Sequence, residues 1–479
     1  MAPNFVLFPY MAQGHTIPMV DIGRLLAARG VTVTIISTPV NSRRISPVID
    51  RAAASGLPIR VAIVEYPSTK VGLPEGCENY DMLPEASDVI RFLHGTTLMK
   101  DDVRNLLKEL RPACLISDML LSWTAEMALD LGIPRLIFHG TSCFAHVMWN
   151  VLETSKAVEA VASNTEYFIM PELPDNVPIT KAQIRGTPGE LPPDWDKLQR
   201  EFFDAEKKSF GTVANTFEEL ELKYVEHYLK TSAKRVWCIG PVSLCNDDEL
   251  DKAERGNKAV IDEHECLKWL DSQDRDSVIF VCLGTLSRVA SSQLIELGLA
   301  LESSGRPFIW VVKSASDEFK SWLSEENFEG RVKGRGLVIR GWAPQLLILS
   351  HASVGGFLTH CGWNSTLEGI SAGLPMATWP VFAEQFINEK FVVYVAKTGV
   401  RVGVEMPVMA GEEEAAGVQV KMEEIKMAID EMMDGGDEGK ERRERARKLG
   451  EMAKMAMAGG GSSYANMTRL IREVQEVEE

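Results

Sequence analysis

The feature that most limits what this chain can fold into is the alternation of short, continuous apolar runs with longer amphipathic stretches. In the first half the apolar runs are residues 5–9, 31–37, 59–66, 113–118, 135–139 and 212–216. Amphipathic segments lie between several of them; residues 17–29, for example, end before Gly30 in the usual C-cap place. Strands that are apolar on both faces and separated by helices predict a parallel sheet covered on both sides.

The same alternation starts again after residue 257. The second set of strand-like runs is 278–283, 308–312, 337–339, 354–358, 375–379 and 401–404. Residues 245–257 are polar and acidic, which is typical of an exposed linker. We therefore predict an α/β protein with two doubly wound domains, residues 1–244 and 258–458. A C-terminal helix within 459–479 is expected to pack back on the first domain.

Composition narrows the class of protein. The net charge of −17 argues against nucleic acid or an anionic membrane as the main partner. The eight cysteines show no paired spacing, so we expect a reducing compartment and no zinc site. No apolar run is long enough to span a bilayer, and the first residues make a poor signal peptide. These observations predict a cytoplasmic protein without integral membrane association, which we expect to be a monomer.

Residues 342–385 carry the most functional information. The segment repeats an apolar strand, a turn of small or polar residues and a helix start. Ser365 and Glu368 have the spacing of a capping box, which would be a purely structural role. The same geometry also suits a ligand, because free N–H groups at a helix start and its positive dipole end can hold a diphosphate without Lys or Arg.

This segment resembles, almost position for position, the signature box of the plant UDP-dependent glycosyltransferases. The resemblance extends over essentially the whole chain, including residues 72–79, 138–144 and 459–464. It implies the GT-B architecture, two Rossmann-like domains that face each other across a cleft. It also implies a UDP-sugar site in the second domain, and an acceptor like those of the subgroup acting on flavonoids, triterpenoids and steroids.

The resemblance assigns roles to single residues around the donor. The phosphate contacts are implied for His360, Asn364, Ser365, the backbone of Trp363 and the hydroxyl of Thr285, with Ser287 as a weaker candidate. The nucleoside contacts are implied for Trp342 (stacking on uracil), Ala343 (backbone to uracil), Gln345 and Glu368 (ribose hydroxyls). Leu283 departs from the aromatic residue that is more common in the family before Gly284.

The sugar end of the site is less sharply defined. Glu384 and Gln385 are implied to bind sugar hydroxyls, although many relatives have Asp in place of Glu384. Both could instead be the cap and first turn of a helix over 384–397. Gln at this position is associated with UDP-glucose, so we expect glucose to be the sugar. Thr141, rather than Ser142, is our candidate for a further sugar or phosphate contact.

His15 and Asp118 are the expected catalytic pair. His15 follows the first strand in a Gln-Gly-His loop, and Asp118 ends the strand 114–118. Structurally, His15 could be a surface histidine and Asp118 the N-cap of a helix over 121–131. The family places its general base and that base's carboxylate partner at these two positions. An imidazole can take the acceptor's proton, and the carboxylate fixes its tautomer and stabilises the imidazolium.

The predicted function is transfer of a sugar, most simply glucose, from a UDP-sugar to a hydroxyl of a small lipophilic metabolite. Attack opposite UDP inverts the anomeric carbon. No metal or other cofactor is expected, because neutral donors and a helix dipole can hold the leaving UDP. Two alternatives stay open: a GT-B enzyme with another donor, and a non-catalytic protein that binds a nucleotide sugar.

Overall fold

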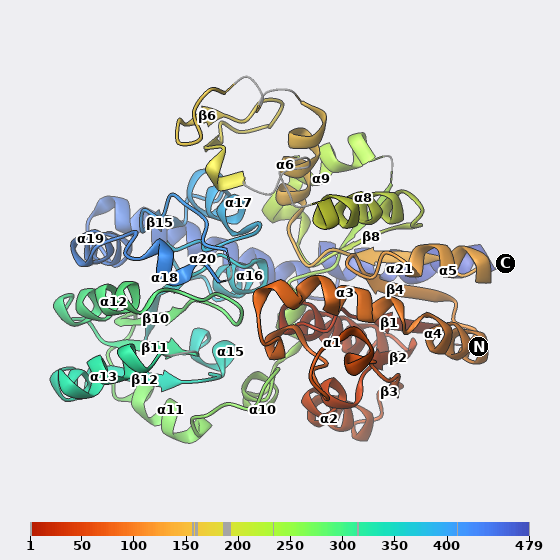
Figure 1. Ribbon diagram of the computed structural model, residues 1–479, viewed down its shortest axis with the longest axis horizontal. Coiled ribbons are helices and arrows are strands. Elements are labelled where there is room, and N and C mark those ends of the chain that lie inside the picture. Colours follow the sequence, from red (N-terminus) through yellow and green to blue (C-terminus); the bar gives the residue numbers. More distant parts are fainter. Residues whose placement is uncertain are drawn as a thin grey trace.

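The computed structural model describes residues 2–155, 158, 161–184, 193–232, 234–313, 316–409 and 411–478. The chain forms two α/β units that lie side by side, each built on one parallel sheet (Figure 1). This confirms the predicted fold class.

The N-terminal unit contains a seven-stranded sheet in the order β3-β2-β1-β4-β5-β8-β9. Its strands are β1 (Asn4–Phe8), β2 (Thr32–Ser37), β3 (Ile59–Ile63), β4 (Cys114–Asp118), β5 (Arg135–Phe138), β8 (Gly211–Ala214) and β9 (Arg235–Cys238). Its helices are α1 (Gln13–Ala27), α2 (Pro39–Ala54), α3 (Val89–Thr97), α4 (Lys100–Leu110), α5 (Thr124–Leu131), α6 (Cys143–Thr154), α8 (Pro193–Lys207) and α9 (Glu218–Ser232). A short antiparallel pair, β6 (Phe168–Ile169) with β7 (Pro178–Ile179), lies apart from the main sheet.

The C-terminal unit contains a six-stranded sheet in the order β12-β11-β10-β13-β14-β15. Its strands are β10 (Val278–Cys282), β11 (Phe308–Val312), β12 (Gly336–Arg340), β13 (Val354–Thr359), β14 (Met376–Thr378) and β15 (Gly399–Arg401). Its helices are α11 (Glu263–Asp271), α12 (Ser291–Ser303), α13 (Asp317–Glu325), α14 (Phe328–Arg331), α15 (Gln345–Leu349), α16 (Trp363–Ser371), α17 (Gln385–Lys390), α18 (Glu413–Ala416), α19 (Met422–Met432) and α20 (Asp437–Met457).

Continuous apolar runs form the central strands because both faces of each sheet are covered by helices. All five residues of β10 and of β11 are buried, and so are those of β4. The sequence placed most strands within two residues of their observed bounds. It did not identify β9 or the β6–β7 pair as strands, and the last strand lies at Gly399–Arg401 rather than at 401–404.

Each sheet reverses its strand order at one place. In the N-terminal unit this switch lies between β1 and β4, and in the C-terminal unit between β10 and β13. The connections that leave the two strands of a switch point run in opposite directions, which opens a crevice at the carboxyl ends of the strands. The chain therefore has one natural ligand crevice in each unit.

The connection between the units is exposed only in part, whereas its composition suggested an exposed linker throughout. It contains the short helix α10 (Glu249–Ala253), and Asn246 and Asp251 are buried. Arg24 of α1 donates to the side-chain oxygen of Asn246 at 2.6 Å and pairs with Asp251. Asp251 also pairs with Arg51 of α2 at 2.9 Å. Two of its acidic residues, Asp251 and Glu254, are therefore paired with arginines of the N-terminal unit, while residues 247–249 are exposed.

The last helix, α21 (Ser462–Glu478), returns to the N-terminal unit. Figure 1 places both chain ends on the same side, and α21 packs beside β9. Met467, Leu470 and Val474 are buried in the core of that unit. Asn466 adds a hydrogen bond from its Nδ2 to the carbonyl of Cys238 at 3.1 Å. Within the described parts of the chain, we find no helix that is long and apolar enough to cross a membrane.

Candidate active site

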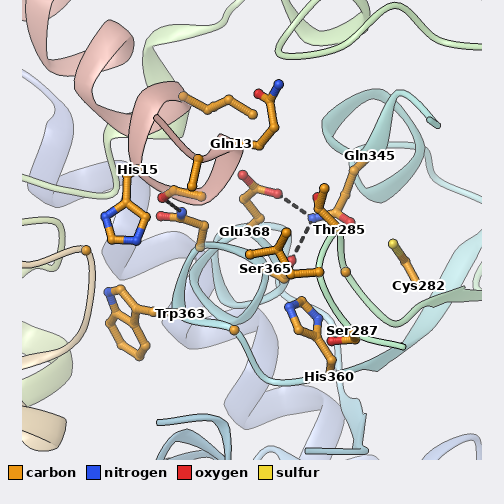
Figure 2. A pocket seen from close by; sticks show the side chains of 18 of the residues that line it. Gln13, His15, Cys282, Thr285, Ser287, Gln345, His360, Trp363, Ser365 and Glu368 are labelled. Atoms are coloured by element: carbon orange, nitrogen blue, oxygen red, sulfur yellow. Dashed lines mark hydrogen bonds between the residues drawn. The ribbon is translucent and has the colours of Figure 1, made fainter. Parts of the chain in front are cut away.

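A cavity of about 340 Å³ lies between the two units, and residues from both form its walls. The sequence-predicted residues that line it are His15, Thr285, Ser287, Trp342, Ala343, Gln345, His360, Trp363, Asn364, Ser365, Glu368, Glu384 and Gln385. Asp118 lies behind His15. Thr141 is not among the lining residues, although its neighbour Gly140 is. Figure 2 shows His15, which comes from α1, on one side of the site and the cluster around Thr285, Gln345, Ser365 and Glu368 on the other.

His15 and Asp118 meet at the switch point of the N-terminal sheet. His15 sits in the first turn of α1, which begins four residues earlier than its apolar pattern indicated. Its Nδ1 lies 2.7 Å from Oδ2 of Asp118, whose side chain is fully buried at the end of β4. The other oxygen of Asp118 accepts the N–H of Leu120 at 3.0 Å. Asp118 is therefore not the cap of the next helix, since α5 begins only at Thr124.

This geometry defines the electrostatic state of the histidine. Burial acts to lower the pKa of His15, but the charge and hydrogen bond of Asp118, helped by the charge of Glu384, outweigh it and raise the pKa. With Nδ1–H donating to Asp118, Nε2 carries the lone pair and has no hydrogen-bond partner among the described residues. The ring is thus prepared to accept a proton at Nε2.

Helix α16 starts at the switch point of the C-terminal sheet. Gly362 is its N-cap and no side chain caps it, so the capping-box interpretation of Ser365 and Glu368 is wrong. Instead, Nε2 of Gln345 donates to Ser365 Oγ at 3.1 Å and to Glu368 Oε2 at 2.7 Å (Figure 2). The helix begins at Trp363, which turns both side chains toward the cavity. The N–H groups of the first turn are left without a side-chain cap.

His360 is held as a neutral imidazole. Its ring lies between two turns, and a Cβ added at Gly284 would collide with it, as would one at Gly362. Burial, with a smaller effect of the Lys313 charge, lowers the pKa of His360 to about 3. Its Nδ1 is buried without a partner among the described residues. His360 can therefore hydrogen-bond to an anion but brings no positive charge.

Two side chains of α16 reach across to the N-terminal unit. Nδ2 of Asn364 donates to the carbonyl of Gly14 at 2.5 Å, next to His15. Nδ2 of Asn215 donates to Asn364 Oδ1 at 3.3 Å, and the indole N–H of Trp363 donates to the carbonyl of Asn215 at 2.8 Å. These bonds fix the phosphate-facing helix against the loop that carries the histidine. The sequence analysis did not predict Asn215 as a site residue. Its position directly after β8, at the carboxyl end of a parallel strand, could have indicated one.

Glu384 and Gln385 occupy the start of α17. Glu384 is the N-cap residue but makes no side-chain cap, and burial raises its pKa. Gln385 is buried, and its Oε1 accepts the N–H groups of Val381 at 2.9 Å and Phe382 at 3.2 Å. Only the Nε2 donor of Gln385 is then left for a ligand. The α-helix ends at Lys390 and is followed directly by a π-helical turn, Phe391–Val395. The helix expected over 384–397 is therefore α-helical only in its first part.

Three cations in the cavity wall, Lys252, Arg255 and Lys313, were missed by the sequence analysis. Arg255 pairs with Asp21 of α1 at 2.7 Å and with Glu368 of α16. Lys313 follows β11 and donates to the hydroxyl of Thr285 at 2.7 Å. A basic residue directly after a buried parallel strand was a usable signal for Lys313. The sequence contained no comparable signal for Arg255, because its partners Asp21 and Glu368 lie in distant segments of the chain.

Comparison with known proteins identifies the family. The model of the family described as "UDP-glucoronosyl and UDP-glucosyl transferase" matches residues 253–427. UDP-glycosyltransferase 73E1 of Stevia rebaudiana is 52% identical over 438 residues, which cover 90% of this chain and 88% of the relative. UDP-glycosyltransferase 73C25 of Barbarea vulgaris is 50% identical over 443 residues, covering 91% and 89%. The chain belongs to the plant UDP-glycosyltransferases.

A solved structure of another member of this family supports the assignment. The crystal structure of Glycyrrhiza uralensis UGT73P12, complexed with glycyrrhetinic acid 3-O-monoglucuronide, is 40% identical. It superposes with a TM-score of 0.93 and covers 100% of this chain and 96% of that one. The predicted family, the GT-B fold and the activity of a UDP-sugar glycosyltransferase are thereby confirmed. In the described part of this UDP-glycosyltransferase, no three His, Cys, Asp or Glu side chains are grouped as in a metal site.

Proposed function

We propose that this UDP-glycosyltransferase moves glucose from UDP-glucose to a hydroxyl of a small lipophilic plant metabolite, with inversion at the anomeric carbon. The observation that carries the proposal is the His15–Asp118 pair, 2.7 Å apart, set against the uncapped start of α16 across one cavity. The two parts stand at the two switch points, where crevices form.

The donor nucleotide would lie along the C-terminal wall. Its uracil stacks on Trp342, its ribose hydroxyls meet Glu368 and Gln345, and its diphosphate meets the first-turn N–H groups of α16. Neutral His360 and the hydroxyls of Thr285 and Ser365 add hydrogen bonds. The support is that these groups line one cavity and that several of their polar atoms lack partners among the described residues, including Nδ1 of His360 and Nε1 of Trp342.

In the transfer step, Nε2 of His15 takes the proton of the acceptor hydroxyl as its oxygen bonds to sugar C1. The bond between C1 and the β-phosphate oxygen breaks, and UDP leaves with that electron pair. Asp118 stabilises the imidazolium that forms. The proton then passes to solvent. Attack from the face opposite UDP converts an α-linked donor into a β-glycoside.

The acceptor class follows from the N-terminal wall of the cavity. The residues that line it there are mostly aromatic or aliphatic: Tyr10, Ala12, Ile17, Tyr80 and Leu120. Such a wall favours a lipophilic acceptor of the flavonoid, other phenolic, triterpenoid or steroid type. The relative from Glycyrrhiza uralensis, complexed with glycyrrhetinic acid 3-O-monoglucuronide, is consistent with this range.

Glucose is the proposed sugar because Gln385 lines the cavity at the position where Gln is associated with UDP-glucose in the family, next to Glu384. The Glu384 carboxylate accepts sugar hydroxyls, while Gln385 contributes its remaining Nε2 donor. We further propose a cytoplasmic monomer; all eight cysteines are free thiols, which fits a reducing compartment.

The test combines an acceptor panel with one variant. Purified enzyme is incubated with UDP-glucose and a set of phenolic and terpenoid alcohols, and products are read by mass and anomeric coupling. His15→Ala is expected to lose about 10²–10⁴-fold in turnover while still binding UDP, as removal of a general base requires. Near-wild-type turnover of this variant with un-ionised acceptors would refute the role of His15. UDP binding without any product from the wild-type enzyme would favour a non-catalytic binding protein.

A further inference from the structure

Lys313 places an ammonium group in the cavity wall, and this group has no counter-ion among the described residues. Nζ of Lys313 lies 4.2 Å from the ring centre of Trp342 and donates to Thr285 Oγ1 at 2.7 Å. Among the residues that the structure describes, no carboxylate pairs with it. Asp81 is the carboxylate whose charge reaches it, and both oxygens of Asp81 are bound by Arg44 at 2.9 and 3.0 Å.

Arg255, another cation in this wall, has its charge fully compensated. It forms ion pairs with Asp21 and Glu368, so its charge is neutralised within the protein. Lys313 contrasts with it, because burial lowers its pKa and no ion pair offsets that effect. A largely desolvated charge without a partner is unfavourable, and proteins keep such charges paired or at ligand sites. The missing partner of Lys313 is therefore expected to be an anion that enters the cavity.

We propose that Lys313 binds the diphosphate of the UDP-sugar, a contact that rests on the donor site proposed above. The ammonium lies between the ring expected to stack on uracil and the hydroxyl expected to touch the β-phosphate. An ammonium only donates hydrogen bonds, so Thr285 must accept from it and its own O–H is free to donate outward. Thr285, with His360 near it, faces the cavity in Figure 2.

This assignment changes how the leaving group is held. The helix start of α16 and neutral His360 provide dipoles without net charge. Lys313 adds a full positive charge where a diphosphate carries several negative ones, in a protein of net charge −17. Charge-assisted hydrogen bonds of this kind are roughly twice as strong as neutral ones.

The experiment compares three ligands on four proteins. Uridine, UMP and UDP are titrated calorimetrically into wild type, Lys313→Met, Lys313→Arg and Lys333→Met. Lys333 is an exposed lysine of the same unit, so its variant controls for the loss of one positive charge. Lys313→Met is expected to bind UDP about 10- to 100-fold more weakly, and uridine within about twofold of wild type. Lys313→Arg should recover most of the UDP affinity.

Thermal melts distinguish a binding role from a structural one. Removing an uncompensated charge should leave the Tm of ligand-free Lys313→Met equal to or above that of wild type, while the UDP-induced rise in Tm shrinks. Equal loss of uridine and UDP affinity, or unchanged UDP affinity, would overturn the assignment of Lys313. Absence of UDP binding by wild type would instead overturn the donor site itself, so the two failures are distinguishable.

Discussion

The hydrogen bond of the second Asp118 oxygen predicts that two substitutions, Asp118→Asn and Asp118→Ala, will affect turnover to different extents. In Asp118→Asn, the amide oxygen is still needed by the N–H of Leu120, 3.0 Å away. The amide NH₂ then faces His15 Nδ1, which must become the acceptor, so the ring proton moves to Nε2. Turning the amide around would place two N–H donors against each other, at a cost of about 1–3 kcal/mol. Asp118→Asn thus holds His15 in the tautomer whose Nε2 already carries a proton, so Nε2 cannot take the acceptor's proton.

Asp118→Ala has a different consequence. The imidazole loses its charge-assisted bond, which contributes about 1.5–3 kcal/mol when the imidazolium forms, but it keeps a free choice of tautomer. Turnover should fall about 10- to 150-fold. Turnover of Asp118→Asn should fall further, toward the roughly 10²–10⁴-fold loss expected for His15→Ala. The conservative substitution is therefore expected to be the more damaging one.

The assay is the initial rate of glucoside formation from an aliphatic alcohol acceptor between pH 5 and 9. For wild type, kcat/KM should rise with pH to a midpoint above 6.5, because the base must be neutral and Asp118 raises the pKa of His15. In Asp118→Ala the midpoint should move to lower pH, since burial then acts with less opposition. UDP affinity serves as the control for folding. Asp118→Asn being as active as Asp118→Ala, or a midpoint that moves upward, would refute the reasoning.

Three further predictions concern the donor site. Activity should survive excess EDTA, because the α16 helix start and Lys313 hold the diphosphate; loss on chelation that manganese restores would contradict this. Gln385→Glu keeps the oxygen that binds Val381 and Phe382 but removes the Nε2 donor, so the rate with UDP-glucose should fall several-fold to about tenfold without loss of stability. If the wild-type enzyme used UDP-glucose, UDP-galactose and UDP-xylose at equal rates in competition, this would count against a contact between Gln385 and the sugar. Gly284→Ala should weaken UDP binding by displacing His360, whereas Gly305→Ala, also left-handed but with open space around it, should only lower the Tm.

The fold was readable because its signals are local. Buried parallel strands must be apolar along their whole length, so β10 and β11 are visible as continuous runs. The donor residues were readable because most of them fall in one segment that must make a strand, a turn and a helix start in fixed order. His15 and Asp118 are 103 residues apart, yet each ends or follows a strand at the same switch point. Family resemblance, rather than spacing, supplied their roles.

What could not be read depends on side-chain direction and on contacts between distant segments. The spacing of Ser365 and Glu368 fits a capping box, but only the start of α16 at Trp363 decides that they face the cavity. Asp251 looked solvated because its partners, Arg24 and Arg51, lie more than 190 residues away. Composition records how many charges a segment carries and not whether another segment neutralises them.

The return of α21 to the N-terminal unit makes the two halves of this protein less modular than their sheets imply. Met467, Leu470 and Val474 complete a core whose other members come from the first half of the chain. A chimera joined only at the linker would carry α21 from one protein and the N-terminal core from another. The apolar contacts of α21 beside β9 would then not match. Exchange of acceptor specificity between relatives should therefore transplant residues 462–478 together with the N-terminal half. The same helix gives the two units a second covalent connection, from α20 to α21.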